Sequence, residues 1–341
     1  MEAPVDMKVS VVIPVFNKAA HVREAVESIL RGTWQDLELI AVDDRSTDDS
    51  LNVLRSITDP RLRVIALERN LGPAGAMNAG IEACRGEYIA RLDADDIAVP
   101  ERLAMQVAFM DAHPHIGASS GHLTLIGDEK GTWRFPLTPE ACRARILFST
   151  PIVQGSCILR RSVIQEHGIR YDADWPRVGE DWLLWSRLLK VTEMSNVDAV
   201  LLHYRRGSDN VSRTSDHVRH RALIGQVFQS WGIELSEDDA RSHLFVQRKF
   251  RQAPTPADIH AVRAWLDKLL RMNEQRQLFP QEAFRAQVEQ AWNELFHYLP
   301  PFGVPVAWAH LRIPSADRRA HAIYLAKYRL RQLIGRATRN R

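Results

Sequence analysis

Three carboxylates, Asp93, Asp95 and Asp96, lie within four positions directly after the apolar run 88–92. Acidic side chains crowded at the end of a buried strand repel one another, so they need a cation or hydrogen-bond donors nearby. Asp93 and Asp95 leave an extended chain on the same face, and paired carboxylates suit Mg²⁺ or Mn²⁺, which take phosphate and water as further ligands. The pattern predicts a divalent cation site, with Asp96 as a helix cap; a plain strand end with a cap is the alternative for so short a motif.

Other polar residues follow strand-like apolar runs in the same way. In parallel α/β sheets the carboxyl ends of the strands meet at one edge, and ligands bind outside that edge. Several polar clusters at this edge predict one binding site more strongly than any single cluster does. They are Asn17, Asp43, Asp44, Asn70 and Asp93, after the runs 9–13, 37–42, 62–67 and 88–92.

Helical periodicity separates these runs. The first predicted helix has apolar residues from Val22 to Leu30 at helical spacing, Asn17 as its cap, and an end near Gly32. The next begins at Ser46 or Thr47. Others are predicted over 74–84 and from Pro100 to 112. Strands alternating with helices predict an α/β fold with a doubly wound, mostly parallel, Rossmann-like sheet.

The second part of the chain has a different pattern. Strand-like runs continue at 117–125, 156–159 and 197–203. After about residue 212 the periodicity is helical, over 218–231, 256–270 and 280–299. We therefore expect one domain over 1–212 and a helical C-terminal region over 213–341.

Composition is that of an ordinary soluble protein, with 45% hydrophobic and 26% charged residues among 341. Residues 1–6 lack the basic and apolar parts of a signal peptide, and no run approaches the roughly 18 apolar residues of a membrane span. Cys84, Cys142 and Cys157 fit neither a disulfide framework nor a zinc site. We expect a cytoplasmic protein.

The segment 312–341 is strongly basic, with Asp317 as its single acidic residue. Ala326, Leu330, Leu333 and Ile334 form an apolar stripe beside the basic positions. Such a tail indicates contact with anionic lipid or nucleic acid, and a basic amphipathic helix can lie at the inner face of a membrane. A helix packed on the domain with a solvated charged face is the alternative.

Seven blocks in order resemble the inverting family 2 glycosyltransferases, which have the nucleotide-sugar-binding GT-A fold. The resemblance covers roughly residues 8 to 212. The blocks are 11–17, 42–48, 69–72, 78–81, 86–96, 179–182 and 204–205.

The resemblance implies a role for individual residues. Phe16, with Pro14 and Val15, would line the base pocket, and Asp43 would accept a hydrogen bond from the uracil ring. Asn17, Asp44 and Asn70 would belong to the same nucleotide-sugar site. Asp93 would lie at the ribose or the metal, and Asp95 would bind the metal that bridges to the diphosphate. The catalytic base would be Asp181, oriented by its neighbourhood including Glu180.

Structural explanations remain open for several of these residues. Asp43 and Asp44 could form a turn, Glu180 and Asp181 could favour a helix dipole, and Gly72 and Gly75 could permit a turn. Trp182 and Trp185 could line the acceptor site or the core. Arg69 and Arg91 could reach the diphosphate or pair with acids. Met77 and Gly207 stand where family members often have a basic residue and a histidine. His203 could substitute for that histidine in space, but on a strand it is expected to pack.

The resemblance thus implies a metal-dependent inverting transferase that moves sugar from a UDP-sugar to a saccharide or lipid-linked acceptor in surface polysaccharide assembly. Mn²⁺ or Mg²⁺ would stabilise the leaving diphosphate, one carboxylate would deprotonate the acceptor, and no nucleic acid partner is expected. A sugar nucleotidyltransferase is one alternative, although residues 14–18 lack its glycine-rich loop. A non-catalytic nucleotide-sugar or carbohydrate-binding protein is the other, and the presence of both Asp95 and Asp181 argues against it.

Overall fold

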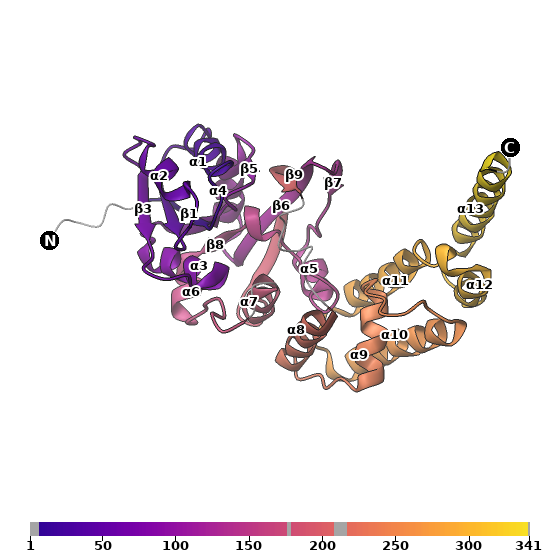
Figure 1. Cartoon of the computed structure of the whole chain (residues 1–341). Coiled ribbons are helices and arrows are strands. Elements are labelled where there is room, and N and C mark those ends of the chain that lie inside the picture. Colours follow the sequence, from indigo (N-terminus) through magenta and orange to yellow (C-terminus); the bar gives the residue numbers. More distant parts are fainter. Residues whose placement is uncertain (1–6, 176–178, 208–216, 340–341) are drawn as a thin grey trace. The chain divides into compact units, whose positions relative to one another are not determined.

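The computed structural model describes residues 7–175, 179–207 and 217–339, with side chains as far as residue 332 (Figure 1). The chain divides into two compact units, Met1–Ser215 and Asp216–Arg341. The first unit contains β1 (Val9–Val15), α1 (Val22–Leu30), β2 (Leu37–Asp43), α2 (Ser50–Arg55), β3 (Leu62–Ala66), α3 (Gly72–Ala83), β4 (Tyr88–Arg91), β5 (Ile97–Ala98), α4 (Arg102–Ala112), β6 (Ile116–Gly127), β7 (Gly131–Trp133), α5 (Pro139–Arg145), β8 (Ile158–Arg160), α6 (Arg161–Glu166), α7 (Glu180–Leu188) and β9 (Glu193–Arg206).

The strands form one mixed sheet in the order β3-β2-β1-β4-β8-β6-β9-β5, and β7 pairs with β6. The first four strands are parallel, as the alternating pattern predicts. Their register aligns the carboxyl ends, because Val15 lies opposite Asp43 and Asp43 lies opposite Ala66. Beyond β4 the pairings with β8 and then β6 are antiparallel. The polar residues at the carboxyl ends of these parallel strands therefore lie at one edge of the sheet.

The central parallel strands β1 and β2 are mostly apolar because both faces of the sheet are covered, and their buried polar residues Ser10 and Glu38 are hydrogen-bonded to each other. β1 and β2 are almost completely buried, the pattern expected of parallel strands between helices. Helix α3 packs on β1 and β2. A Cβ at Gly80 of α3 would lie 2.3 Å from a methyl carbon of Val12, so glycine is required for this close approach. That contact fixes the helix whose N-terminus faces the binding edge.

Several element boundaries differ from those predicted. Asn17 does not cap α1, which begins at Val22 after His21. The next helix starts at Ser50 rather than at Ser46 or Thr47. In both cases the side chains at the predicted cap bond to a neighbouring loop instead of a helix end. The short strands β5 and β7 were not predicted, because two or three residues carry too little periodicity.

The second unit is helical in the part that the structure describes. Its core includes the buried side chains of Trp265, Phe284 and Trp292. Ser236 and Thr255 form capping boxes at the starts of α9 (Glu237–Val246) and α10 (Pro256–Arg276). The helices are α8 (His217–Ser230), α9 (Glu237–Val246), α10 (Pro256–Arg276), α11 (Gln281–Phe296), α12 (Val304–Arg312) and α13 (Arg318–Arg339).

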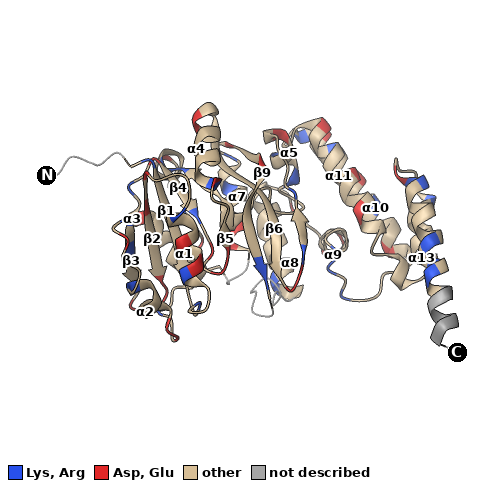
Figure 2. Ribbon diagram, turned by 90° about the horizontal axis from the view of Figure 1, so that it is seen from above, with Lys and Arg blue, Asp and Glu red and all other residues tan. Residues whose placement is uncertain are grey.

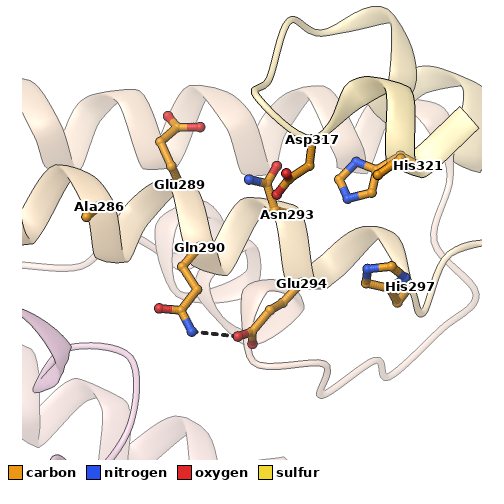
Figure 3. A pocket seen from close by; sticks show the side chains of 9 residues that line it. Ala286, Glu289, Gln290, Asn293, Glu294, His297, Asp317 and His321 are labelled. Atoms are coloured by element: carbon orange, nitrogen blue, oxygen red, sulfur yellow. Dashed lines mark hydrogen bonds between the residues drawn. The ribbon is translucent and has the colours of Figure 1, made fainter. Parts of the chain in front are cut away.

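A pocket of about 410 Å³ lies between α11 and the start of α13 (Figure 3). His321 lines it and is 2% exposed. The fully buried ring of His310 stacks on Trp292 at 3.9 Å between centroids. Burial lowers the pKa of His310 to about 4 and also lowers that of His321. The unit therefore holds neutral imidazoles in its interior.

All three cysteines are free and buried. Burial raises the pKa of each of the Cys84, Cys142 and Cys157 thiols to about 12. These thiols are therefore protonated at neutral pH. Among the helices described, none is both long enough and apolar enough to cross a membrane.

Candidate functional site

Asp43 ends β2 at the binding edge and is 2% exposed. Its Oδ2 accepts a hydrogen bond from the Ser46 backbone N–H at 3.2 Å. Its buried Oδ1 has no hydrogen-bond partner among the described residues. A buried carboxylate oxygen left in this state is costly, so an external donor would satisfy it. Phe16, which is 38% exposed, follows β1 directly beside this strand end.

Asp44 and Asn70 tie two strand ends together. The Asp44 Oδ1 accepts the Leu71 backbone N–H at 2.6 Å, and the Asp44 carbonyl accepts the Asn70 side-chain amide at 2.9 Å. Both side chains therefore position the loop that leads into α3. Pro14 and Val15 are strand residues, and Val15 is buried.

Asn17 joins the loop after β1 to the loop after β2. Its φ of 52° is in the left-handed region, which asparagine tolerates better than most residues. Its Oδ1 accepts the Thr47 backbone N–H at 2.8 Å and the Asp48 N–H at 3.3 Å. The next two residues are held as well, since the Lys18 N–H donates to Ser50 Oγ and the Ala19 N–H to Asp48 Oδ2. Segment 17–19 is thereby fastened to segment 46–50.

Each carboxylate of the cluster at 93–96 has its own polar partner. Asp93 pairs with Arg91 at 2.8 Å, and Asp95 pairs with Lys18 at 2.6 Å. Asp96 is 1% exposed and accepts the Arg205 backbone N–H at 2.8 Å. The prediction that Asp96 caps a helix is wrong, because β5 follows it and α4 begins only at Arg102. Burial, together with the charges of Asp93 and Asp95, raises the pKa of Asp96.

Arg205 of β9 fixes the backbone beneath these carboxylates. Its Nε donates to the Asp95 carbonyl at 2.9 Å, and its Nη2 pairs with Glu24 at 2.8 Å. Gly155 lies next to the carboxylates themselves, because a Cβ at this residue would stand 3.1 Å from Asp93 Oδ2 and 3.2 Å from Asp96 Oδ2. A side chain at residue 155 would thus crowd the carboxylates. Arg205 belongs to the family-like block 204–205, but these contacts of Arg205 and the close approach at Gly155 were not predicted from the sequence.

Glu180 and Asp181 form the first turn of α7, after Gly179 with a φ of 90°. Burial and the neighbouring Asp181 raise the pKa of Glu180 to about 7. Burial also raises the pKa of Asp181, and Asp93 adds to the effect. The Trp182 N–H donates to Asp181 Oδ1 at 2.8 Å. The electrostatic influence of Asp93 on Asp181 indicates that α7 and the end of β4 lie close together.

Arg91 is a buried cation of this region, and the buried Arg102 donates a hydrogen bond to its backbone carbonyl. Burial opposes its charge, but Asp93, Tyr171 and Glu180 together raise its pKa. Its charge also lowers the pKa values of Glu180 and Asp181. Of the two sequence interpretations of Arg91, the structure favours pairing with acids.

A pocket of about 220 Å³ opens between the start of α3 and α7. Glu180 lines it, and so does Trp175, which the sequence did not single out. Gly72 also lines it and has a φ of 74°, so the glycine permits a turn that other residues disfavour. Trp182 and Trp185 belong to the core, since they are 5% and 0% exposed.

Among the described side chains, no group of three or more His, Cys, Asp and Glu residues is arranged to hold a metal ion. Asp93 and Asp95 supply hard oxygen donors that suit Mg²⁺ or Mn²⁺ when a diphosphate and water complete the coordination. His203 lies on β9 opposite Ile97 of β5 and is partly buried. The residues therefore fit a cation that is held jointly by protein and substrate.

Known proteins resemble this chain in sequence. A family model described as glycosyl transferase family 2 matches residues 10–168. The succinoglycan biosynthesis protein ExoO of Rhizobium meliloti is 32% identical over 64% of this chain and 67% of its own length. The UDP-Glc:alpha-D-GlcNAc-diphosphoundecaprenol beta-1,3-glucosyltransferase WfaP of Escherichia coli is 30% identical, over 66% of this chain and 87% of its own length.

Solved structures share the fold. TarS of S. aureus, solved in complex with UDP-GlcNAc, aligns with a TM-score of 0.59 over 89% of each chain at 18% identity. The mannosyltransferase PcManGT of Pyrobaculum calidifontis, in complex with GDP-Man and Mn²⁺, aligns with a TM-score of 0.55 at 18% identity, over 96% of this chain and 89% of its own. The fold is the GT-A fold, and the protein is a glycosyltransferase. This chain belongs to glycosyl transferase family 2.

Proposed function

We propose that the protein is a metal-dependent, inverting glycosyltransferase that moves a sugar from a UDP-sugar to a saccharide or glycolipid acceptor. The observation that carries the proposal is that several carboxylates with different surroundings lie at one edge of the sheet. Asp43 offers a buried unpaired oxygen, Asp93 and Asp95 lie at a second strand end, and Asp181 has a raised pKa within electrostatic reach of Asp93. Polysaccharide biosynthesis in related proteins supports surface polysaccharide assembly as the setting.

Uridine recognition is assigned to Asp43 and Phe16. The unpaired Asp43 Oδ1 accepts the N–H of the uracil ring, which satisfies an acceptor that the protein leaves open. The exposed ring of Phe16 next to this strand end offers an apolar surface to the base. The UDP-GlcNAc complex of TarS supports a uridine nucleotide as donor.

Asp95 and Asp93 would hold Mn²⁺ or Mg²⁺ together with the donor diphosphate. Such an ion supplies Lewis-acid charge to the leaving diphosphate. Asp95 is the main ligand in this assignment, because Asp93 is paired with the buried Arg91, whereas Asp95 is paired with the partly exposed Lys18. The Mn²⁺ in the PcManGT complex supports a divalent cation in this fold.

Asp181 is the proposed general base, which takes the proton of the acceptor hydroxyl as that oxygen attacks the anomeric carbon. Burial raises its pKa, so the carboxylate is a stronger base than an exposed aspartate. Its Oδ1 is oriented by the Trp182 N–H, and Glu180 stands beside it in the same helical turn. With a single base and no protein nucleophile, the reaction is one displacement with inversion.

Calorimetry of UDP binding tests the donor and metal assignments together. We expect wild-type protein to bind UDP at least tenfold more tightly with Mn²⁺ than without it, on the order of 1.4 kcal/mol. Asp95→Ala should abolish this difference while leaving the fold intact. Equal affinity with and without Mn²⁺ in the wild type would contradict the metal assignment.

A second variant tests the base. Asp181→Asn should keep UDP affinity and lose roughly 10²–10⁴-fold in turnover, the range for loss of general base catalysis. Release of UDP against a panel of acceptors measures the turnover. Turnover close to that of the wild type would remove Asp181 from this role.

A lipid-linked acceptor would bring the enzyme to a membrane surface, and α13 offers a means of contact. Figure 2 shows basic residues along this helix, and its Ile323 and Leu330 are 57% and 58% exposed. Flotation with anionic liposomes should recover the wild type but not the Ile323→Glu, Leu330→Glu double variant. Val218→Glu, which changes a 77% exposed residue on α8, is the control. Equal flotation of all three proteins would contradict docking through α13.

A further inference from the structure

We propose that Lys18 is a releasable counter-ion of Asp95. Its ammonium neutralises Asp95 before the substrates bind, leaves when the divalent cation arrives, and then contacts the donor diphosphate. The inference rests on the proposed function, since it assumes that Asp95 is the main metal ligand. It adds a donor-positioning role for a residue whose type and spacing did not indicate one.

The ion pairs of Asp93 and Asp95 differ in how easily they break. Arg91 is 5% exposed in its side chain and contacts Asp93 through both Nε and Nη2. Lys18 reaches Asp95 through its single ammonium group at 2.6 Å, and its side chain is 26% exposed. An ammonium on a flexible stem can move into water or onto another anion, whereas a buried guanidinium cannot. Asp93 is therefore permanently paired, and Asp95 can exchange its partner.

The backbone of Lys18 stays in place during this exchange. The Lys18 N–H donates to Ser50 Oγ at 2.7 Å, and its neighbours Asn17 and Ala19 are bonded to segment 46–50. Asp95 is fixed from below, because Arg205 donates to its carbonyl at 2.9 Å. Only the lysine side chain and the Asp95 carboxylate need to move.

The position of Lys18 suits contact with a diphosphate. It lies two residues after Phe16 at the proposed base pocket, and its ammonium reaches the proposed metal ligand. A bound nucleotide diphosphate has to extend from the base pocket to the metal ligand. A cation bound at Asp95 repels the ammonium, and the phosphate oxygens attract it at short range. The Lys18 side chain therefore weakens the binding of the metal alone and strengthens the binding of the metal together with the nucleotide.

This arrangement makes the binding of metal and of donor cooperative. In the wild type, metal binding without nucleotide must break the Lys18–Asp95 ion pair with no compensation. When the nucleotide is present, the freed ammonium gains a phosphate partner. Linkage requires that each ligand then increase the affinity for the other by the same factor.

The test measures Mn²⁺ binding to the full chain without nucleotide, by the electron paramagnetic resonance signal of free Mn²⁺. We expect Lys18→Met to bind Mn²⁺ about tenfold more tightly than the wild type, within the usual range of coupling between sites. At saturating Mn²⁺ the same variant should bind UDP about tenfold more weakly. Lys18→Arg keeps the charge and should stay near the wild type for Mn²⁺.

Lys130→Met is the matched control, since it removes the charge of an exposed lysine in the turn between β6 and β7 and should leave both affinities unchanged. Equal Mn²⁺ affinity for Lys18→Met and the wild type would overturn the inference. Asp95→Ala separates this result from failure of the proposed function. If Asp95→Ala retains Mn²⁺ affinity, the metal site itself is wrongly placed; if it loses affinity while Lys18→Met is unchanged, only the role of Lys18 fails.

Discussion

At the scale of single residues, the site is built from carboxylates with unlike surroundings. Asp43 is buried with one open oxygen, Asp93 is paired with a buried arginine, and Asp96 is buried with a raised pKa. In the proposed assignment, one residue type would thus serve as hydrogen-bond acceptor, metal ligand and structural group. Environment, and not residue identity, separates these roles.

Asp43→Asn should weaken UDP binding by roughly tenfold or more, because a hydrogen bond to a charged acceptor contributes about 1.5–3 kcal/mol. Asp36→Asn is a suitable control, since Asp36 is exposed at the opposite end of β2. Calorimetry with UDP measures both variants. If the two variants bind UDP equally well, Asp43 does not contact the base.

The pair Glu180 and Asp181 should set the acid limb of the pH profile. The pKa of Glu180 is raised to about 7 by burial and by Asp181, so below this pH the pair gains a proton and turnover should fall. Glu180→Gln removes one titrating group and should move the acid limb to lower pH. Initial rates between pH 5 and 9 measure the shift, and an unmoved limb would separate Glu180 from the base.

At the scale of elements, the loops after β1 and β2 act as one piece. Asn17 joins the two loops, because its backbone is left-handed and its side-chain oxygen accepts hydrogen bonds from the N–H groups of Thr47 and Asp48. The resemblance placed Asn17 at the nucleotide, whereas its side-chain oxygen is occupied by the neighbouring loop. Its effect on the donor is therefore expected to come through the position of Lys18 and Phe16.

Asn17→Gly should lower the free energy of unfolding through the lost hydrogen bonds, and Asn17→Ala should lower it by about 1 kcal/mol more, because alanine is strained at positive φ. Chemical denaturation of the first unit measures the difference. Both variants should also bind UDP more weakly than the wild type. Equal stability of the alanine and glycine variants would argue against backbone strain at residue 17.

The sequence predicts the elements that carry local periodicity and fails where distant residues meet. The strands before Asp43 and Asp93 are found because β-branched runs and following polar residues are local signals. The Lys18–Asp95 pair joins residues 77 apart, and the bond from Arg205 to the Asp95 carbonyl spans 110. Such pairs depend on sheet order, which no short pattern encodes. Asp96 was misjudged for this reason, since its partner lies on β9.

At the scale of the whole molecule, one buried group in each unit is expected to make the two units respond to acid in opposite directions between pH 7 and 5. In the first unit the pKa of Glu180 is raised to about 7, so the folded state binds more protons than the unfolded state between pH 7 and 5, and stability increases as pH falls. In the second unit the pKa of His310 is lowered to about 4 by burial, so the unfolded state binds more protons and stability decreases as pH falls.

Between pH 7 and pH 5 each effect amounts to about 2 kcal/mol when a pKa is shifted by two to three units. Hydrogen exchange, corrected for intrinsic rates, should show stronger protection of β1 and β2 at pH 5 than at pH 7 and weaker protection of α11 and α12. Glu180→Gln and His310→Gln should each flatten the response of their own unit. If protection changed in the same direction in both units, the assignment of these effects to Glu180 and His310 would be contradicted.

The burial of the three cysteines has a practical consequence for labelling the protein. Thiols that remain protonated and covered react slowly with maleimide reagents while the protein is folded. A single cysteine introduced at Lys130 would then be labelled selectively without removing the native residues. Spin labels or fluorophores attached there could report on the loop between β6 and β7 in the otherwise natural chain.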